Sequence, residues 1–100
     1  MFCDYIFKGN SQELAKLLEY HFSEDDFFTE SLGIEYPESF SYWLPCSPKE
    51  IMDKGLTELT VRILIVKRWR YGKPDLQEDL LDEFRKQYPD LEIDMEYIGD

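Results

Sequence analysis

The run from Leu56 to Arg70 constrains the fold most, because it is long and dense in β-branched residues. In an extended conformation, one side of its middle carries Leu59, Val61, Ile63 and Ile65, and the other carries Thr60, Arg62, Leu64 and Val66. A strand that is largely apolar on both faces belongs inside a sheet. We therefore expect a sheet with this strand at its centre.

Three further segments are expected to be strands of the same sheet. The last segment alternates strictly, with Leu91, Ile93, Met95 and Tyr97 against Glu92, Asp94 and Glu96. This alternation is typical of a strand with one face on a core and one in water. Residues 1–8 are rich in aromatic side chains and end at a Gly-Asn turn, and residues 40–44 form a short segment that a proline stops.

Two long helices and one short helix are expected between these strands. The first covers about residues 12–22 with Ser11 as its N-cap, and the second covers about residues 74–87 and ends before Pro89. Their apolar stripes are Leu14, Leu17, Leu18 and Phe22, with His21 at the edge, and Leu76, Leu80, Leu81, Phe84 and Tyr88. Ser47, Pro48 and Glu50 have the spacing of a capping box, which predicts a short helix that ends at Gly55.

The order of these elements predicts an α+β fold. It favours a four-stranded antiparallel sheet with the two long helices on one face and a short extra helix, the ferredoxin-like split βαβ arrangement. The 100 residues fit one domain over residues 1–100. Residues 23–40 are irregular but carry costly apolar area, so we expect an ordered excursion packed on the domain. The expected core joins Leu59, Val61, Ile63, Ile65, Leu91, Ile93 and Met95 to Leu14, Leu17, Leu18, Leu76, Leu80 and Phe84.

The part from Leu59 to Asp100 resembles small ferredoxin-like domains encoded by phages and mobile elements. The resemblance covers about the last 40 residues. It consists of the apolar strand, the segment Arg68 to Pro74, an acidic amphipathic helix, and the strand that follows Tyr88 and Pro89. It implies a fold and a mobile-element origin, and it brings no catalytic residues with it.

The charge excludes several classes of partner. The chain has 22 acidic and 11 basic residues, for a formal net charge of −11. A field of this sign repels phosphate backbones and anionic lipid, so we expect no direct binding of nucleic acid and no membrane binding. Residues 1–8 lack the pattern of a secretory signal, and no apolar stretch approaches the ~18 residues of a spanning helix. A soluble protein of the cytoplasm, in a host cell, is therefore expected.

No motif identifies a reaction. Cys3, His21 and Cys46 are too few and too far apart for a zinc site, and the isolated glycines have no phosphate-binding spacing. A Cys–His dyad could assemble in space, but a satisfied structural histidine is the favoured interpretation of His21. Both cysteines are expected to be reduced thiols. We therefore predict that the chain is not an enzyme and has no metal and no cofactor.

The acidic residues of the C-terminal quarter are the first candidate site. Residues 75–100 hold ten acids against Arg85 and Lys86, a net charge of −8. The acids expected on exposed faces are Glu78, Asp79, Asp82 and Glu83 on the helix and Glu92, Asp94 and Glu96 on the strand. Their regular spacing could present negative charges as phosphates do, and would attract a basic, nucleic-acid-binding partner. A solvated charged face is the alternative for each single carboxylate.

The basic segment of residues 67–73 is the second candidate. It interleaves basic residues with Trp69 and Tyr71. It could be a strand end whose cations pair with nearby acids, a protein-binding hot spot around the two aromatic residues, or an RNA-stacking surface.

The expected function is that of a non-enzymatic acidic inhibitor of phage or mobile-element origin. It would bind and block a basic nucleic-acid-handling defence complex of the host, as anti-CRISPR or anti-restriction proteins do, and could mimic nucleic acid. The alternative is an immunity or antitoxin protein that neutralises a nuclease toxin. An RNA-binding module is a third hypothesis. The sequence leaves the oligomeric state open.

Overall fold

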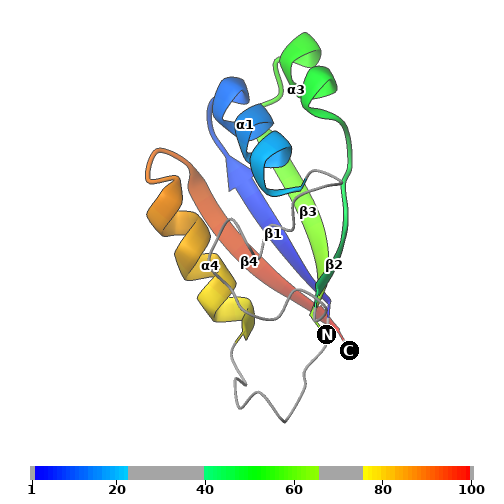
Figure 1. Cartoon of the computed structure of the whole chain (residues 1–100), viewed down its shortest axis with the longest axis vertical. Coiled ribbons are helices and arrows are strands. Elements are labelled where there is room, and N and C mark those ends of the chain that lie inside the picture. The colour runs from blue at the N-terminus through cyan, green and yellow to red at the C-terminus, as the bar shows by residue number, and fades with distance from the viewer. Residues whose placement is uncertain (1, 23–39, 66–75, 100) are drawn as a thin grey trace.

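The structure is a computed structural model that describes residues 2–22, 40–65 and 76–99 (Figure 1). Two sequence predictions lie outside the described residues. The first is the ordered excursion expected at residues 23–40, of which only Phe40 is described. The second is the basic segment of residues 67–73 with Trp69 and Tyr71.

Four strands form one antiparallel sheet in the order β2-β3-β1-β4. The strands are β1 (Phe2–Lys8), β2 (Phe40–Trp43), β3 (Glu58–Ile65) and β4 (Glu92–Gly99). The strand that is apolar on both sides, β3, lies inside the sheet between β2 and β1, as its pattern indicates. The predicted α+β class with a four-stranded antiparallel sheet is confirmed.

Three helices accompany the sheet, namely α1 (Ser11–His21), α3 (Pro48–Lys54) and α4 (Leu76–Gln87). The short helix α3 begins with the predicted capping box between Ser47 and Glu50 and ends at Gly55, whose φ of 60° is the left-handed conformation of a helix C-cap. The apolar side chain that holds α3 is Ile51, which is fully buried.

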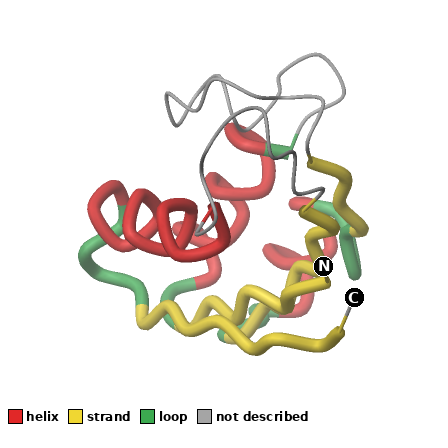
Figure 2. The backbone as a smooth tube through the Cα atoms, turned by 90° about the horizontal axis from the view of Figure 1, so that it is seen from below, coloured by secondary structure: helices red, strands yellow, loops and turns green. Residues whose placement is uncertain are grey.

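Both long helices cover the same face of the sheet. On β1, Cys3, Tyr5 and Phe7 are buried, whereas the residues that alternate with them are only half-buried. The Phe84 ring of α4 lies 5.2 Å from the Phe7 ring, and 5.9 Å from the His21 ring of α1. Figure 2 shows the two long helices on one side of the strands. One face of the sheet therefore carries the core, and the other, called the open face below, is covered by neither of these helices.

The core contains most of the predicted residues. Buried among them are Leu14, Leu17, Leu18, Leu59, Val61, Ile63, Leu80, Phe84, Leu91 and Ile93, and Met95 is half-buried. The side chains of Ile65 and Leu76 lie outside the described set. The expectation for Tyr97 is wrong, since 55% of it is exposed. Tyr97 is among the last residues of an edge strand, which diverge from α4 in Figure 1.

The N-cap of α1 is Asn10, and the prediction of Ser11 is wrong by one residue. Asn10 has an extended backbone, and its Oδ1 accepts a hydrogen bond of 2.7 Å from the Gln12 amide. Asparagine satisfies a first-turn amide as well as serine does. Ser11 is therefore the first helical residue.

Replacing Asn10 with Ala is expected to cost about 0.5–2 kcal/mol of unfolding free energy, because the Gln12 amide loses its acceptor. Replacing Ser11 with Ala should change the free energy of unfolding by less than about 0.5 kcal/mol, because Ser11 is a helical residue and the helix propensities of Ser and Ala differ only slightly. Urea unfolding followed by circular dichroism measures both variants. The reverse ranking would contradict the assigned cap.

Candidate functional site

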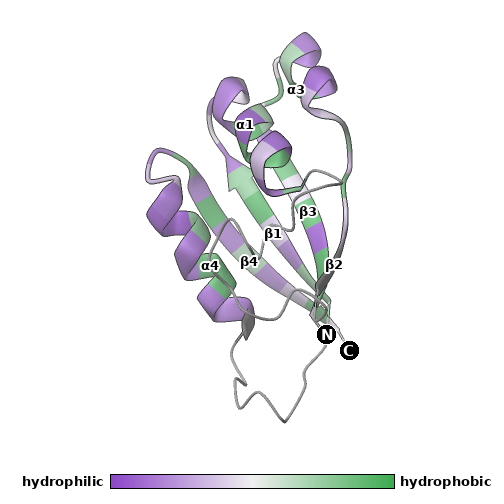
Figure 3. Ribbon diagram, viewed as in Figure 1, coloured by the Kyte–Doolittle hydropathy of each residue, from purple (hydrophilic) through white to green (hydrophobic). Residues whose placement is uncertain are grey.

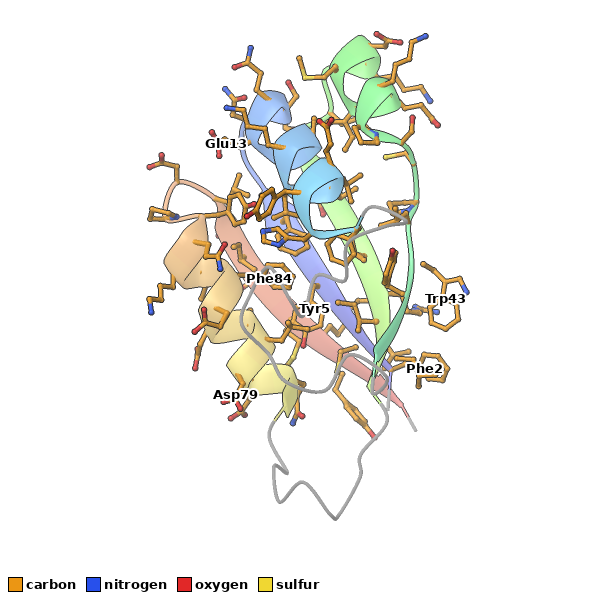
Figure 4. The ribbon with its side chains drawn as sticks, viewed as in Figure 1. Phe2, Tyr5, Glu13, Trp43, Asp79 and Phe84 are labelled. Carbon is orange, nitrogen blue, oxygen red and sulfur yellow. The ribbon has the colours of Figure 1, made fainter. Side chains whose placement is uncertain are left out.

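The acidic residues of α4 lie on its outer surface. Glu78, Asp79 and Asp82 are exposed and lie away from the buried Leu80, and Glu83 is half-buried. Asp79 points away from the molecule in Figure 4, and the outer surface of α4 is hydrophilic in Figure 3.

The acidic residues of β4 lie on the open face of the sheet. Glu92, Asp94 and Glu96 are exposed, whereas Ile93 between them is buried in the core. Successive side chains of a strand point to opposite faces, so these three carboxylates point away from the helices. The structure therefore places the two predicted acidic rows on different faces of the molecule.

Arg85 separates the two rows at the edge of the sheet. From α4, its Nε and Nη2 donate to the carbonyl oxygen of Ile93 at 3.0 and 2.8 Å, and Nη2 lies 3.5 Å from Asp94 Oδ1. β4 is the last strand of the sheet, so this carbonyl belongs to the edge. The guanidinium thus satisfies an edge carbonyl and partly neutralises one acid of the β4 row.

The open face also contains a pair of opposite charges that the sequence analysis did not single out. Arg62 of β3 lies across from Asp4 of β1, with its Nε 2.8 Å from Asp4 Oδ1 and its Nη2 3.1 Å from Oδ2. The hydrogen bond and the charge of Asp4 raise the pKa of Arg62. The Arg62 side chain is half exposed, so solvent screens this bidentate pair and it contributes little to stability.

An open hollow of about 510 Å³ lies beside this pair. Its apolar side is formed by Phe2, Trp43, Leu44 and Pro45, and its polar side by Asp4, Thr60 and Arg62. The rings of Phe2 and Trp43 have their centroids 6.0 Å apart, and 53% of Trp43 is exposed. Figure 4 shows these two side chains next to each other, away from the core.

The hollow was not predicted from the sequence. Phe2, Asp4 and Ile6 share one face of β1, but two of them are as apolar as Cys3, Tyr5 and Phe7 on the other face, so the alternation did not distinguish the two faces.

The residues considered for nucleophilic chemistry are dispersed. His21 is fully buried, and its Nε2 lies 2.7 Å from the hydroxyl of Tyr88. Cys3 is buried and Cys46 is half-buried, and neither forms a disulfide. Burial and, second, the charge of Glu50 raise the pKa of the Cys46 thiol, which reduces its thiolate fraction at neutral pH.

The described residues contain neither a candidate metal-binding cluster nor a candidate membrane-spanning helix. Within residues 2–22, 40–65 and 76–99, no three His, Cys, Asp or Glu side chains gather into a set that could hold a metal ion. Among the described helices, none is both long and apolar enough to cross a membrane.

Comparisons of the chain with protein-family models, with curated proteins and with solved structures found no match. Its function therefore has to be inferred from its own residues and their geometry.

Proposed function

We propose that this chain is a non-enzymatic acidic inhibitor, of phage or mobile-element origin, that binds and blocks a basic nucleic-acid-handling defence complex of a host cell. The action would be of the anti-CRISPR or anti-restriction type, in the cytoplasm of the host. The ferredoxin-like arrangement is part of this proposal. The antiparallel order β2-β3-β1-β4, with α1 and α4 over one face, supports it.

One observation carries the proposal, namely that most carboxylates of the two acidic rows on α4 and β4 form no ion pair with another described residue. Within the described part of the chain, Asp94 is the only one of the seven acids of these two rows that forms an ion pair. On α4, Glu78 and Asp82 are one helical turn apart, as are Asp79 and Glu83. Each such like-charge pair costs about 0.2–0.5 kcal/mol.

A basic partner would remove this cost. Lysine and arginine side chains placed on the two rows would screen their mutual repulsion, and the charge of −11 would steer the partner during diffusion. A groove that normally holds a phosphate backbone has the required charge and regular spacing. Occupation of that groove would exclude the nucleic acid and so block its cleavage.

The test is a cleavage assay on a panel of purified CRISPR effector complexes, restriction endonucleases and nuclease-toxin domains, with and without this protein. We expect stoichiometric inhibition of a member of the first two classes. The inhibition should weaken steeply above ~0.15 M salt, where the Debye length is about 8 Å. Inhibition confined to the toxin domains would instead favour an immunity protein.

Two triple charge-reversal variants, one for each acidic row, test which row binds the partner. Reversing either Glu78, Asp79 and Asp82 or Glu92, Asp94 and Glu96 to Lys leaves the buried side chains untouched, and circular dichroism should show an intact fold. At least one of these triple variants should lose the inhibition. Inhibition that survives both reversals and is indifferent to salt would rule out recognition through the acidic rows.

A further inference from the structure

The open face of the sheet combines an apolar hollow with an acidic rim. The hollow is lined by Phe2 of β1, by Trp43 at the end of β2 and by Leu44 just after β2. The exposed fraction of Leu44 is 37%. The rim is the row Glu92, Asp94 and Glu96 on β4, at the opposite edge of the sheet.

The charges of this face do not balance. By register, its charged side chains on the described strands are Asp4, Glu58, Glu92, Asp94 and Glu96 against Lys8 and Arg62, a net charge of −3. Asp4 lies between Arg62 on β3 and Glu96 on β4. Carboxylates directly opposite each other on neighbouring strands repel. Arg62 forms its ion pair with Asp4, and no other described residue forms an ion pair with Glu96, which can therefore bind a cation of a partner.

The register fixes the distance between hollow and rim. Trp43, Arg62, Asp4 and Glu96 form one row across the four strands. Neighbouring strands lie about 4.8 Å apart, so Trp43 and Glu96 are separated by about 14 Å, and Asp4, on the near side of the hollow, is about 5 Å from Glu96. An extended protein segment of about four residues spans the distance from Trp43 to Glu96.

We propose that the open face of the sheet is the docking surface for a basic protein segment, which places an apolar side chain in the hollow at Trp43 and Lys or Arg side chains on the β4 acids. This inference rests on the proposed function and names the surface that performs it. An apolar anchor surrounded by charges has the organisation of a binding hot spot.

Other occupants fit this face less well. A second copy of the chain brings another −11, and nucleic acid is repelled by the same charge despite the exposed Trp43. A strand added at β4 would compete with Arg85, which already holds the Ile93 carbonyl. The acidic surface of α4 has no exposed large apolar residue in the described part of the chain, so it offers charge without an anchor.

Two peptides of equal charge test the proposal on the full chain. The probe is acetyl-Leu-Gly-Gly-Arg-Arg-Arg-amide, and the control is acetyl-Gly-Gly-Gly-Arg-Arg-Arg-amide. Titration into ¹⁵N-labelled protein, followed by amide and indole shifts, should move the signals of Trp43, Thr60 and Glu96 more than those of α4. The leucine should strengthen binding about threefold to tenfold over the control, and Trp43→Ala should abolish this gain.

Variants in which acidic residues are replaced by their amides test where the arginines of the probe bind. The triple variant Glu92→Gln, Asp94→Asn, Glu96→Gln should weaken binding of the probe at least about fivefold at low salt. A variant with the same change of charge elsewhere, Glu13→Gln, Glu19→Gln, Asp53→Asn, should weaken it less than about twofold. Trp43 is exposed, so its replacement should leave the spectrum of the core unchanged.

Several results would overturn the proposal. These are no binding of the probe at millimolar concentration, equal weakening by both triple variants, shifts confined to α4, or tight binding of a decauridylate RNA to the same face. Shifts on α4 together with nuclease inhibition would move the docking surface and leave the proposed function standing. Binding on the open face without inhibition of any nuclease would keep the surface and refute the function.

Discussion

Replacing Phe84 with Ala is expected to lower the free energy of unfolding by about 3–5 kcal/mol. Phe84 is fully buried, and its ring lies within 5.2–6.2 Å, centroid to centroid, of the rings of Tyr5, Phe7, His21 and Phe22. These rings belong to β1 and to the end of α1, so this one side chain of α4 joins both long helices to the sheet. Removing it opens a cavity where the three elements meet.

Urea unfolding monitored by circular dichroism measures this loss. A domain of this size is stable by about 5–15 kcal/mol, so the variant should unfold at a much lower urea concentration. Met52→Ala is the control, because 46% of Met52 is exposed on α3, and it should cost less than about 1 kcal/mol. A loss below about 1 kcal/mol for Phe84→Ala would contradict the assigned core.

The second large effect is a loss of stability at alkaline pH. Burial first, and the charge of Cys3 second, raise the pKa of Tyr5 well above its usual range, and its hydroxyl donates a hydrogen bond of 2.8 Å to the Gln77 carbonyl. Burial, followed by the charge of Glu13 and by Tyr20, raises the pKa of Tyr88 to about 12. Both residues keep their protons in the folded state at a pH where the unfolded chain loses them.

The direction in which the free energy of unfolding changes with pH follows from the number of protons bound in each state. Below about pH 10, the ordinary pKa of tyrosine, both states are protonated and the full stability is present. Above it, the unfolded state binds fewer protons, so stability falls as pH rises. Tyr5 alone contributes up to about 1.4 kcal/mol per pH unit. Tyr88 contributes between pH 10 and its folded pKa, with an effect reduced by its partial exposure.

Urea unfolding at a series of pH values from 8 to about 12 measures this loss, and the ultraviolet absorbance of tyrosinate identifies the groups. The variant Tyr5→Phe should show a shallower decline above pH 10, although it loses the hydrogen bond to Gln77 at neutral pH. Stability independent of pH between 10 and 12, or ionisation of all tyrosines in the folded protein near pH 10, would contradict the buried placement of Tyr5.

Local patterns predicted the elements because each depends on neighbours in the sequence. The alternation of β4, the stripe of α4 and the capping box of α3 involve residues within a few positions of each other. The N-cap of α1 was misplaced because Asn10 and Ser11 are adjacent and both favour that position. The complete burial of His21 depends on Phe84 and Tyr88, more than 60 residues away.

The candidate site was less predictable, because a face of a sheet is built from distant strands. The sequence identified the acids of α4 and β4 but not that they lie on different faces. That separation depends on which side of the sheet α4 covers. The pairing of Asp4 with Arg62 spans 58 residues and requires the register of β1 and β3. The hollow requires the rings of Phe2 and Trp43 to lie side by side, and these two residues are far apart in the sequence.

The pairing of β1 with β4 brings Phe2 opposite Gly99, at the corner of the sheet where Phe2 lines the hollow. Figure 1 shows the two ends of the chain side by side there. Any polypeptide joined before Phe2 or after Gly99 therefore leaves the domain beside the hollow. An affinity tag at either end would compete with a ligand for this space. A tag inserted after Gly55, in the exposed turn that follows α3, would leave the corner open.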